Sequence, residues 1–237
     1  MKKYIPDTIT SMNLLCGVIG VVFAFKGRLD LAFIFMLAAA VADFLDGLAA
    51  RVLDSYSDLG KELDSLSDLV SFGVLPSVML FNLSRNCMFG ESWVCWVPLV
   101  IALASGLRLA KFNTDDRQVS GFLGVPTTAC GMLCGSLCYY VAVEPATFLA
   151  AWCAGPVFST VLSACICFLL LCEMPVFSLK LHKDDPSALK TKRIALAILF
   201  VAIVLLVVIL HLNWSLIVLL TLTLFVLKNI VYAILKV

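Results

Sequence analysis

The sequence predicts an all-α polytopic membrane protein with about eight transmembrane helices, folded as a single integral membrane domain over residues 1–237. Three observations lead to this fold class. Hydrophobic residues make up 62% of the chain and charged residues only 14%, which is not the composition of a soluble globular domain. Apolar runs of roughly 18 or more residues recur, and each is long enough to cross a bilayer as a helix. Lysine and arginine are concentrated at alternate ends of these runs.

Hydropathy divides the chain into consecutive apolar spans. The first follows a start that contains Pro6 and Asp7 and has no small-residue cleavage site before Lys26, so we interpret it as a retained span and not as a signal peptide. Gly155 and the prolines at 126 and 156 interrupt the helical pattern, so the ends of the fifth and sixth spans are the least defined. The predicted spans cover roughly residues 10–26, 29–52, 60–83, 92–112, 124–143, 147–173, 193–211 and 213–235.

The distribution of basic residues predicts the orientation in the membrane. With both termini in the cytoplasm, only Lys26, Arg28 and Arg85 fall on the outer side. This asymmetry is the one that the positive-inside rule expects, so both termini and the loop between the second and third spans are predicted to be cytoplasmic. The fourteen inner residues are Lys2, Lys3, Arg51, Lys61, Arg108, Lys111, Arg117, Lys180, Lys183, Lys190, Lys192, Arg193, Lys228 and Lys236.

The stretch VADFLDGLAARVLDSYSDLGKELDSLSDLVSFG, residues 41–73, places carboxylates beside and partly inside apolar spans. Helical periodicity puts these residues on two stripes, one on the second span and one on the third. A short turn near residues 55–58 is expected to make the two helices antiparallel neighbours with the stripes facing each other. The first stripe holds Asp43, Asp46, Gly47 and Ala50, and the second holds Gly60, Asp64 and Asp68.

Four converging carboxylates in a partly dry cleft repel one another and need a cationic partner. A hard divalent cation takes oxygen ligands, and two such ions could balance the charge and clamp phosphoryl oxygens. Gly47 and Gly60 would let a bulky ligand approach the backbone, and Arg51 is placed to bind a phosphate with its fork of donors. A cation transporter is a remote alternative, although transporters of that kind repeat their interrupted spans in two halves.

These residues read D-F-L-D-G-L-A-A-R, then G-K-E-L-D-S-L-S-D, which resembles the complete signature DxxDGxxAR…GxxxDxxxD of the CDP-alcohol phosphatidyltransferase family. The resemblance implies a usually dimeric membrane enzyme that moves a phospho-alcohol group from a CDP-linked donor to a hydroxyl and releases CMP. It implies a six-helix catalytic core, here residues 1–175, with two additional C-terminal spans in 193–237. It also implies Mg²⁺ or Mn²⁺, in two sites, held by Asp43, Asp46 and Asp64, with Asp68 as a metal neighbour and general base.

Three further stretches are similar to the bacterial branch of this family that uses serine as acceptor. They are IPDTITSMNLLCG, SDLVSFGVLPS and LRLAKFN…FLGVPTTA, with Asp7, Lys111 and Thr128 departing from the usual residues. This resemblance implies a homodimer in the bacterial inner membrane, with CDP-diacylglycerol and L-serine as substrates. Glycerol 3-phosphate, inositol phosphate and choline remain alternative acceptors. The lysines of residues 178–193 indicate a cytoplasmic surface facing lipid headgroups, and no nucleic-acid partner is expected.

The resemblance also suggests substrate contacts. Gly47, Ala50, Arg51 and Gly60 are expected to line the CDP-diacylglycerol site. Thr10 and Asn13 are further candidates there, although Thr10 could equally cap the first helix. A serine pocket needs a cation for the carboxylate and oxygens for the ammonium group, and Arg108 and Lys111 could alternatively be ordinary membrane-surface anchors. The candidates for that pocket are Ser71, Arg108, Lys111 and Asn113.

Overall fold

The computed structural model describes residues 4–55, 57–87, 93–114, 122–153, 155–172, 175–176 and 199–235. Apart from one pair of two-residue strands, the regular elements of these segments are helices, which confirms the all-α prediction. The helices are α1 (Tyr4–Phe25), α2 (Leu29–Val52), α3 (Asp58–Asp68), the π-helix η1 (Leu69–Val74), α4 (Leu75–Cys87), the 3₁₀-helix η2 (Trp93–Leu99), α5 (Val100–Thr114), α6 (Thr127–Val143), α7 (Phe148–Cys153), α8 (Pro156–Leu171), a short helix at Leu199–Ile209, and α10 (Ser215–Leu235). The strands are β1 (Phe122–Leu123) and β2 (Pro175–Val176).

Four helical segments of the described chain are long and apolar enough to cross a membrane: Tyr4–Phe25, Leu29–Val52, Asp58–Arg85 and Trp93–Thr114. They correspond to the first four predicted spans. The third is continuous through α3, η1 and α4, and the fourth through η2 and α5. Further apolar helical stretches of 10–17 residues are Thr127–Val143, Val157–Leu171, Leu199–Ile209 and Ser215–Val231.

The sixth predicted span, residues 147–173, is not one helix. It is divided into α7 and α8, and α8 begins at Pro156, directly after Gly155. Proline suits the first position of a helix because the N–H that it lacks would have no intrahelical partner there. Of the seventh predicted span, residues 193–211, the described part is helical from Leu199, and residues 193–198 lie outside the described segments.

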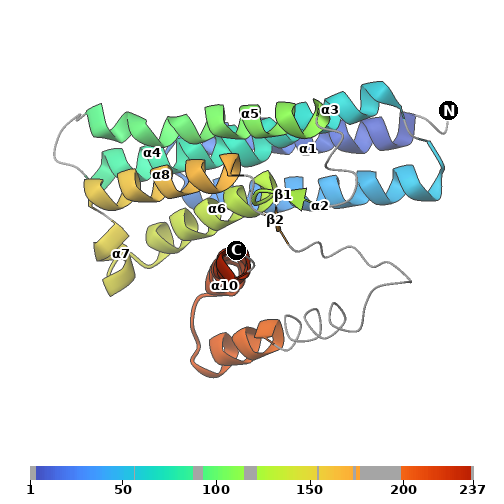
Figure 1. Ribbon diagram of the computed structural model, residues 1–237. Coiled ribbons are helices and arrows are strands. Elements are labelled where there is room, and N and C mark those ends of the chain that lie inside the picture. The colour runs from blue at the N-terminus through green and yellow to red at the C-terminus, as the bar shows by residue number, and fades with distance from the viewer. Residues whose placement is uncertain are drawn as a thin grey trace.

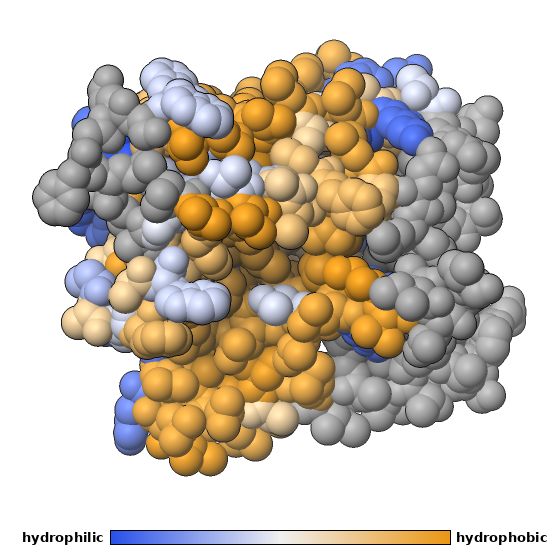
Figure 2. All heavy atoms as spheres, turned by 60° about the vertical axis from the view of Figure 1, so that its left-hand side comes forward, coloured by the Kyte–Doolittle hydropathy of each residue, from blue (hydrophilic) through white to orange (hydrophobic). Residues whose placement is uncertain are grey.

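The long helices form a bundle around the third predicted span. Figure 1 shows α1, α2, α4, α5 and α8 running in a common direction across the molecule. The third span is the most buried, and Phe72, Leu75 and Met79 have no solvent-exposed surface. The face seen in Figure 2 is largely apolar over its described residues. Large hydrophobic side chains such as Phe44 and Leu103 are exposed on the bundle. A bundle that is apolar inside and out is suited to a lipid environment.

The C-terminal helices lie against α6 on one side of the bundle. Figure 1 shows α10 almost end-on while the core helices run across the page, so its axis is steeply inclined to theirs. The connection is aromatic: Trp214 stacks on Phe33, and its indole N–H donates to the hydroxyl of Tyr139 over 3.2 Å. This segment is therefore attached to the core through α2 and α6.

Candidate active site

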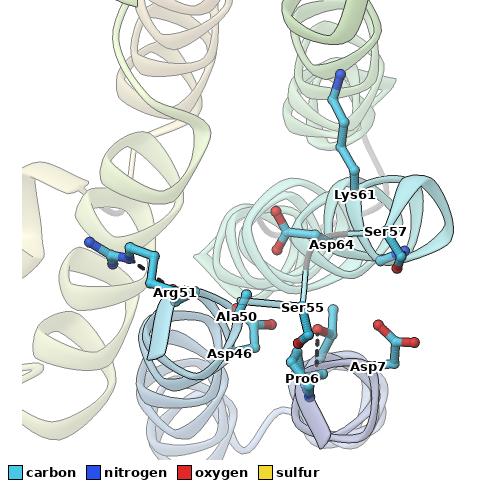
Figure 3. Close-up of a pocket in the computed structure, with 12 residues that line it drawn as sticks. Pro6, Asp7, Asp46, Ala50, Arg51, Ser55, Ser57, Lys61 and Asp64 are labelled. Carbon is cyan, nitrogen blue, oxygen red and sulfur yellow. Dashed lines mark hydrogen bonds between the residues drawn. The ribbon is translucent and has the colours of Figure 1, made fainter. Parts of the chain in front are cut away.

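Three helices, and not two, build the site. The facing stripes were expected on directly packed neighbours, but α2 and α3 each pack along α1 and, over their described residues, make little contact with each other. The two stripes nevertheless face each other, because carboxylate oxygens of α2 and α3 lie within 4.8 Å, and α1 forms a third side of the site by packing along both helices. The three helices and the turn between α2 and α3 enclose a cavity of about 530 Å³. Figure 3 shows Asp7, Asp46 and Asp64 around this space, contributed by three different helices.

The structure gathers three of the four predicted carboxylates at one point. Oxygen atoms of Asp43, Asp64 and Asp68 all lie within 4.8 Å of one another, and the three side chains are partly buried. Asp46 is not in this group. It lies almost one turn further along α2, is buried, and lines the cavity together with Asp64.

The cluster is not neutralised by the protein. Within the described residues, none of these four carboxylates takes part in an ion pair. The buried atoms Asp46 Oδ2 and Asp64 Oδ1 have no hydrogen-bond partner in that part of the chain. Orphaned buried oxygens are costly unless something else binds them. Because Mg²⁺ and Mn²⁺ prefer oxygen ligands, the donor set fits a divalent cation.

Asn13 and Ser71 are joined to Asp68 and to each other. Asn13 Nδ2 donates to Asp68 Oδ1 over 3.3 Å, and the Ser71 hydroxyl donates to Asn13 Oδ1 over 2.7 Å. Neither Asn13 nor Ser71 has any exposed surface. In this structure both side chains are therefore hydrogen-bonded within the protein, and the contacts of Asn13 with the donor and of Ser71 with serine stay predictions.

Thr10 lies in the wall of the cavity. Its hydroxyl donates to Pro6 O over 3.0 Å, and the residue is buried. The alternative interpretation of Thr10 as a helix cap was wrong, because α1 already includes Tyr4. The cap that sequence reasoning missed is Ser57, whose side chain accepts a hydrogen bond from Gly60 N over 2.9 Å. A serine three residues before Gly60, at the end of a turn, was the available signal.

Gly47, Gly60 and Arg51 all line the cavity, as does Ala50. A methyl group on Gly47 would meet only the Arg51 guanidinium, 3.9 Å away, so the surface there is open. A methyl group on Gly60 would lie 2.9 Å from both Asp7 Oδ1 and Ser57 Oγ, so this glycine permits the close approach of α1 and α3. Arg51 Nε donates to Gly47 O over 2.8 Å, and Figure 3 shows the guanidinium directed away from Asp46 and Asp64.

The residues of α5 that were predicted to bind the serine substrate lie in two different environments. Arg108 is buried, its Nη1 donates to Thr127 Oγ1 over 2.9 Å, and its Nε has no partner among the described residues. Burial of this kind is not expected of an exposed surface anchor. Lys111 is exposed, and Asn113 Nδ2 donates to Ser65 Oγ over 2.9 Å, which ties α5 to α3.

Helices of membrane-spanning length with a carboxylate cluster beside an open cavity define a membrane-embedded enzyme site. Comparison with protein families identifies the family, since the CDP-alcohol phosphatidyltransferase model matches residues 3–158, more than half of the chain. The chain belongs to the CDP-alcohol phosphatidyltransferase family.

Three relatives are similar over the same region. The chain is 36% identical over 130 residues to the CDP-diacylglycerol–serine O-phosphatidyltransferase of Bacillus subtilis, and the aligned region makes up 55% of this chain and 72% of that protein. It is 34% identical over 137 residues to the protein of the same name from Methanocaldococcus jannaschii, and the aligned region makes up 58% of this chain and 61% of that protein. It is 34% identical over 125 residues to the archaetidylserine synthase of Methanothermobacter thermautotrophicus, covering 52% of each.

Proposed function

We propose that the protein transfers the phosphatidyl group of CDP-diacylglycerol to the hydroxyl of L-serine and releases CMP. The single observation that carries this proposal is the meeting of Asp43, Asp64 and Asp68 within 4.8 Å, beside a cavity of about 530 Å³. Family membership supplies the reaction class. The names of the relatives support serine as the acceptor.

Mg²⁺ or Mn²⁺, in two sites, is part of this proposal. Asp43, Asp64 and Asp68 would hold the metal, with Asp46 completing the set from the cavity wall. When bound, the ions supply positive charge that stabilises the oxygens of the transferred phosphoryl group. The unpartnered oxygens of Asp46 and Asp64 support this assignment, because they leave acceptor capacity that the described protein does not use.

The donor headgroup is proposed to occupy the cavity. Thr10, Ala50 and Gly60 form its walls, Gly47 leaves room for a bulky group, and Arg51 is exposed at its edge, where a modest rotation would bring its fork of donors to a phosphate. The acyl chains would remain in lipid. Such a position holds the phosphorus near the carboxylate cluster, and orientation of this kind accounts for much of the rate enhancement in phosphoryl transfer.

Asp68 is proposed as the general base. It accepts the proton of the serine hydroxyl as the hydroxyl oxygen bonds to the phosphorus that carries diacylglycerol. The bond from that phosphorus to the CMP oxygen breaks, and the negative charge leaves with CMP. Asp68 is the most suitable of the carboxylates for this role because its Oδ1 is already fixed by Asn13, so its orientation is set before the substrate arrives.

The serine carboxylate is proposed to bind Arg108. This guanidinium is buried and keeps its Nε without a partner among the described residues. A guanidinium binds a carboxylate through two parallel N–H donors. Lys111 and Asn113 would lie at the edge of this pocket. The fourth residue predicted for the serine pocket, Ser71, donates a hydrogen bond to Asn13 in this structure.

The membrane arrangement completes the proposal. Residues 1–175 would form the six-helix core, and 193–237 would add two further spans, giving about eight in an inner-membrane homodimer. The excess of lysine and arginine in alternate loops supports cytoplasmic termini and a cytoplasmic active site. Reporter fusions at the C-terminus test this directly, since a reporter active only in the periplasm should stay inactive.

One assay tests the reaction. Purified protein in detergent receives CDP-diacylglycerol, Mg²⁺ or Mn²⁺, and one acceptor at a time, and CMP release is measured. Release with serine alone is expected. Release only with glycerol 3-phosphate, inositol phosphate or choline would keep the chemistry and change the acceptor, and the absence of CMP with every acceptor would contradict the proposed function.

A further inference from the structure

The environment of Asp68 contains two buried polar side chains that the proposed reaction does not use. Asn13, on α1, and Ser71, on η1, have no exposed surface, so neither can contact a substrate without rearrangement. They are 58 residues apart in the sequence and are joined by a hydrogen bond of 2.7 Å. Asn13 then reaches Asp68 with its amide nitrogen over 3.3 Å.

The neighbours of the Asn13 amide favour one of its two orientations. The Ser71 hydroxyl has a single proton and lies near two acceptors, Asn13 Oδ1 at 2.7 Å and Asn13 O at 3.1 Å. With the amide turned over, its oxygen would face the Asp68 carboxylate, and two acceptors would repel each other. The Asp68 carboxylate therefore selects the orientation in which the NH₂ group of Asn13 faces it, and the Ser71 hydroxyl stabilises this orientation by donating to Asn13 Oδ1 over 2.7 Å.

The backbone around Asp68 is also fixed against α1. The Ser67 hydroxyl donates to Leu63 O over 2.8 Å and lies 3.3 Å from Thr10 O, and the Ser71 hydroxyl lies 3.1 Å from Asn13 O, so the side chains on either side of Asp68 lie against the same helix. A methyl group on Gly17 would collide with Ser71 Oγ, which shows how closely α1 approaches η1. The π-helix begins directly after Asp68, and π-helical turns are frequent at functional sites.

We propose that Asn13, oriented by Ser71, is a positioning residue that fixes Asp68 Oδ1 and so holds the other carboxylate oxygen at the cluster with Asp43 and Asp64, where a divalent cation would bind. The proposal rests on the proposed function, in which Asp68 belongs to the metal site and acts as the base. Partners of metal ligands set the orientation of the ligand, and their loss typically weakens metal binding about 10- to 100-fold. Ser71 is accordingly a support of Asp68 and not a contact for the serine substrate.

Metal affinity tests this without any turnover. Mn²⁺ binding to the purified protein in detergent is measured by electron paramagnetic resonance, with no substrate present. Asn13→Leu should weaken Mn²⁺ binding about 10- to 100-fold, and Ser71→Ala should weaken it by a smaller factor. The matched controls are Asn82→Leu and Ser77→Ala, since both residues are buried and, within the described part of the chain, donate to carbonyls three or four residues earlier in the same continuous helical segment; these variants should bind Mn²⁺ as the wild type does.

Turnover separates the two roles of Ser71. If Ser71 positions Asp68, Ser71→Ala lowers kcat and leaves the KM for serine unchanged. If Ser71 contacts the substrate, the same variant raises the KM for serine and keeps the wild-type Mn²⁺ affinity, and the proposal is overturned. Ser71→Ala removes one oxygen atom, so it remains informative even if Asn13→Leu fails to fold.

The two proposals fail in different ways. Wild-type protein that binds Mn²⁺ but releases no CMP with any acceptor would contradict the proposed function and leave the positioning role intact. Unaltered Mn²⁺ affinity in both Asn13→Leu and Ser71→Ala, in protein that releases CMP, would contradict the positioning role alone. Absence of Mn²⁺ binding by the wild type would contradict both.

Discussion

Replacing Arg108 by alanine should selectively weaken the use of serine. In the structure the guanidinium is buried, has one hydrogen bond to Thr127 Oγ1, and has an Nε without a partner among the described residues. A carboxylate that enters this environment could accept a hydrogen bond from Nε. The alanine variant removes this donor together with the positive charge.

The expected size of the effect follows from the kind of bond. A hydrogen bond to a charged group contributes about 1.5–3 kcal/mol. A loss of about 2–3 kcal/mol corresponds to an increase of about 30- to 150-fold in the KM for serine. The KM for CDP-diacylglycerol should change little, because Arg108 does not line the proposed donor cavity. Arg108→Lys keeps the charge but lacks the planar fork, so an intermediate effect is expected.

Steady-state kinetics of CMP release, with each substrate varied in turn, measures both constants. Arg85→Ala is the control: Arg85 is also an arginine of the bundle, but it is exposed and lies over the Phe81 ring near the opposite end of the third predicted span. It should leave both KM values unchanged. A wild-type KM for serine in folded Arg108→Ala protein would refute the reasoning and remove Arg108 from the pocket.

Three further predictions concern the site and the helices that hold it. Asp64→Asn should abolish metal-dependent CMP release, yet raise the thermal unfolding temperature in EDTA, because it removes one of several mutually repelling carboxylates; an unfolding temperature below that of the wild type would contradict the repulsion. Gly17→Ala should destabilise the protein by about 1–3 kcal/mol, since its methyl group would collide with Ser71, whereas Gly106→Ala should be tolerated because its nearest neighbour would lie at 3.6 Å. Equal unfolding temperatures for these two variants would show that α1 and η1 can separate without cost. Ser57→Ala should cost about 1 kcal/mol through loss of the cap of α3, and Ser57→Asp, which restores an acceptor, should recover most of it in the same thermal assay.

The membrane fold and the carboxylate cluster could both be predicted because each depends on local patterns. Hydrophobic runs of span length identify membrane helices whatever they pack against. Asp64 and Asp68 share a helical face by periodicity alone, and no tertiary contact can move them apart. The same reasoning placed Asp43 and Asp46 on one face of α2, where the structure has Asp43 at the cluster and Asp46 at the cavity wall.

The interpretations that failed depended on where a helix begins or on which helix is its neighbour. Thr10 was a reasonable cap only if the first helix started beside it, and the polar start of α1 hides its true beginning at or before Tyr4. The direct packing of α2 on α3 was inferred from the shortness of the turn between them. A short turn limits the distance between two helix ends, but it does not prevent a third helix from lying along both.

The sequence by itself determined the class of environment, the helices and the residue types that carry the chemistry, because hydrophobicity and helical periodicity act over a few turns of a single element. Only the tertiary structure decided that α1 packs along both α2 and α3, that Asn13 is hydrogen-bonded to Asp68 and to Ser71, and that Arg108 is buried beside Thr127. Such contacts join residues far apart in the chain. Their formation depends on how side chains of several helices fit together, and no pattern within one helix records that fit.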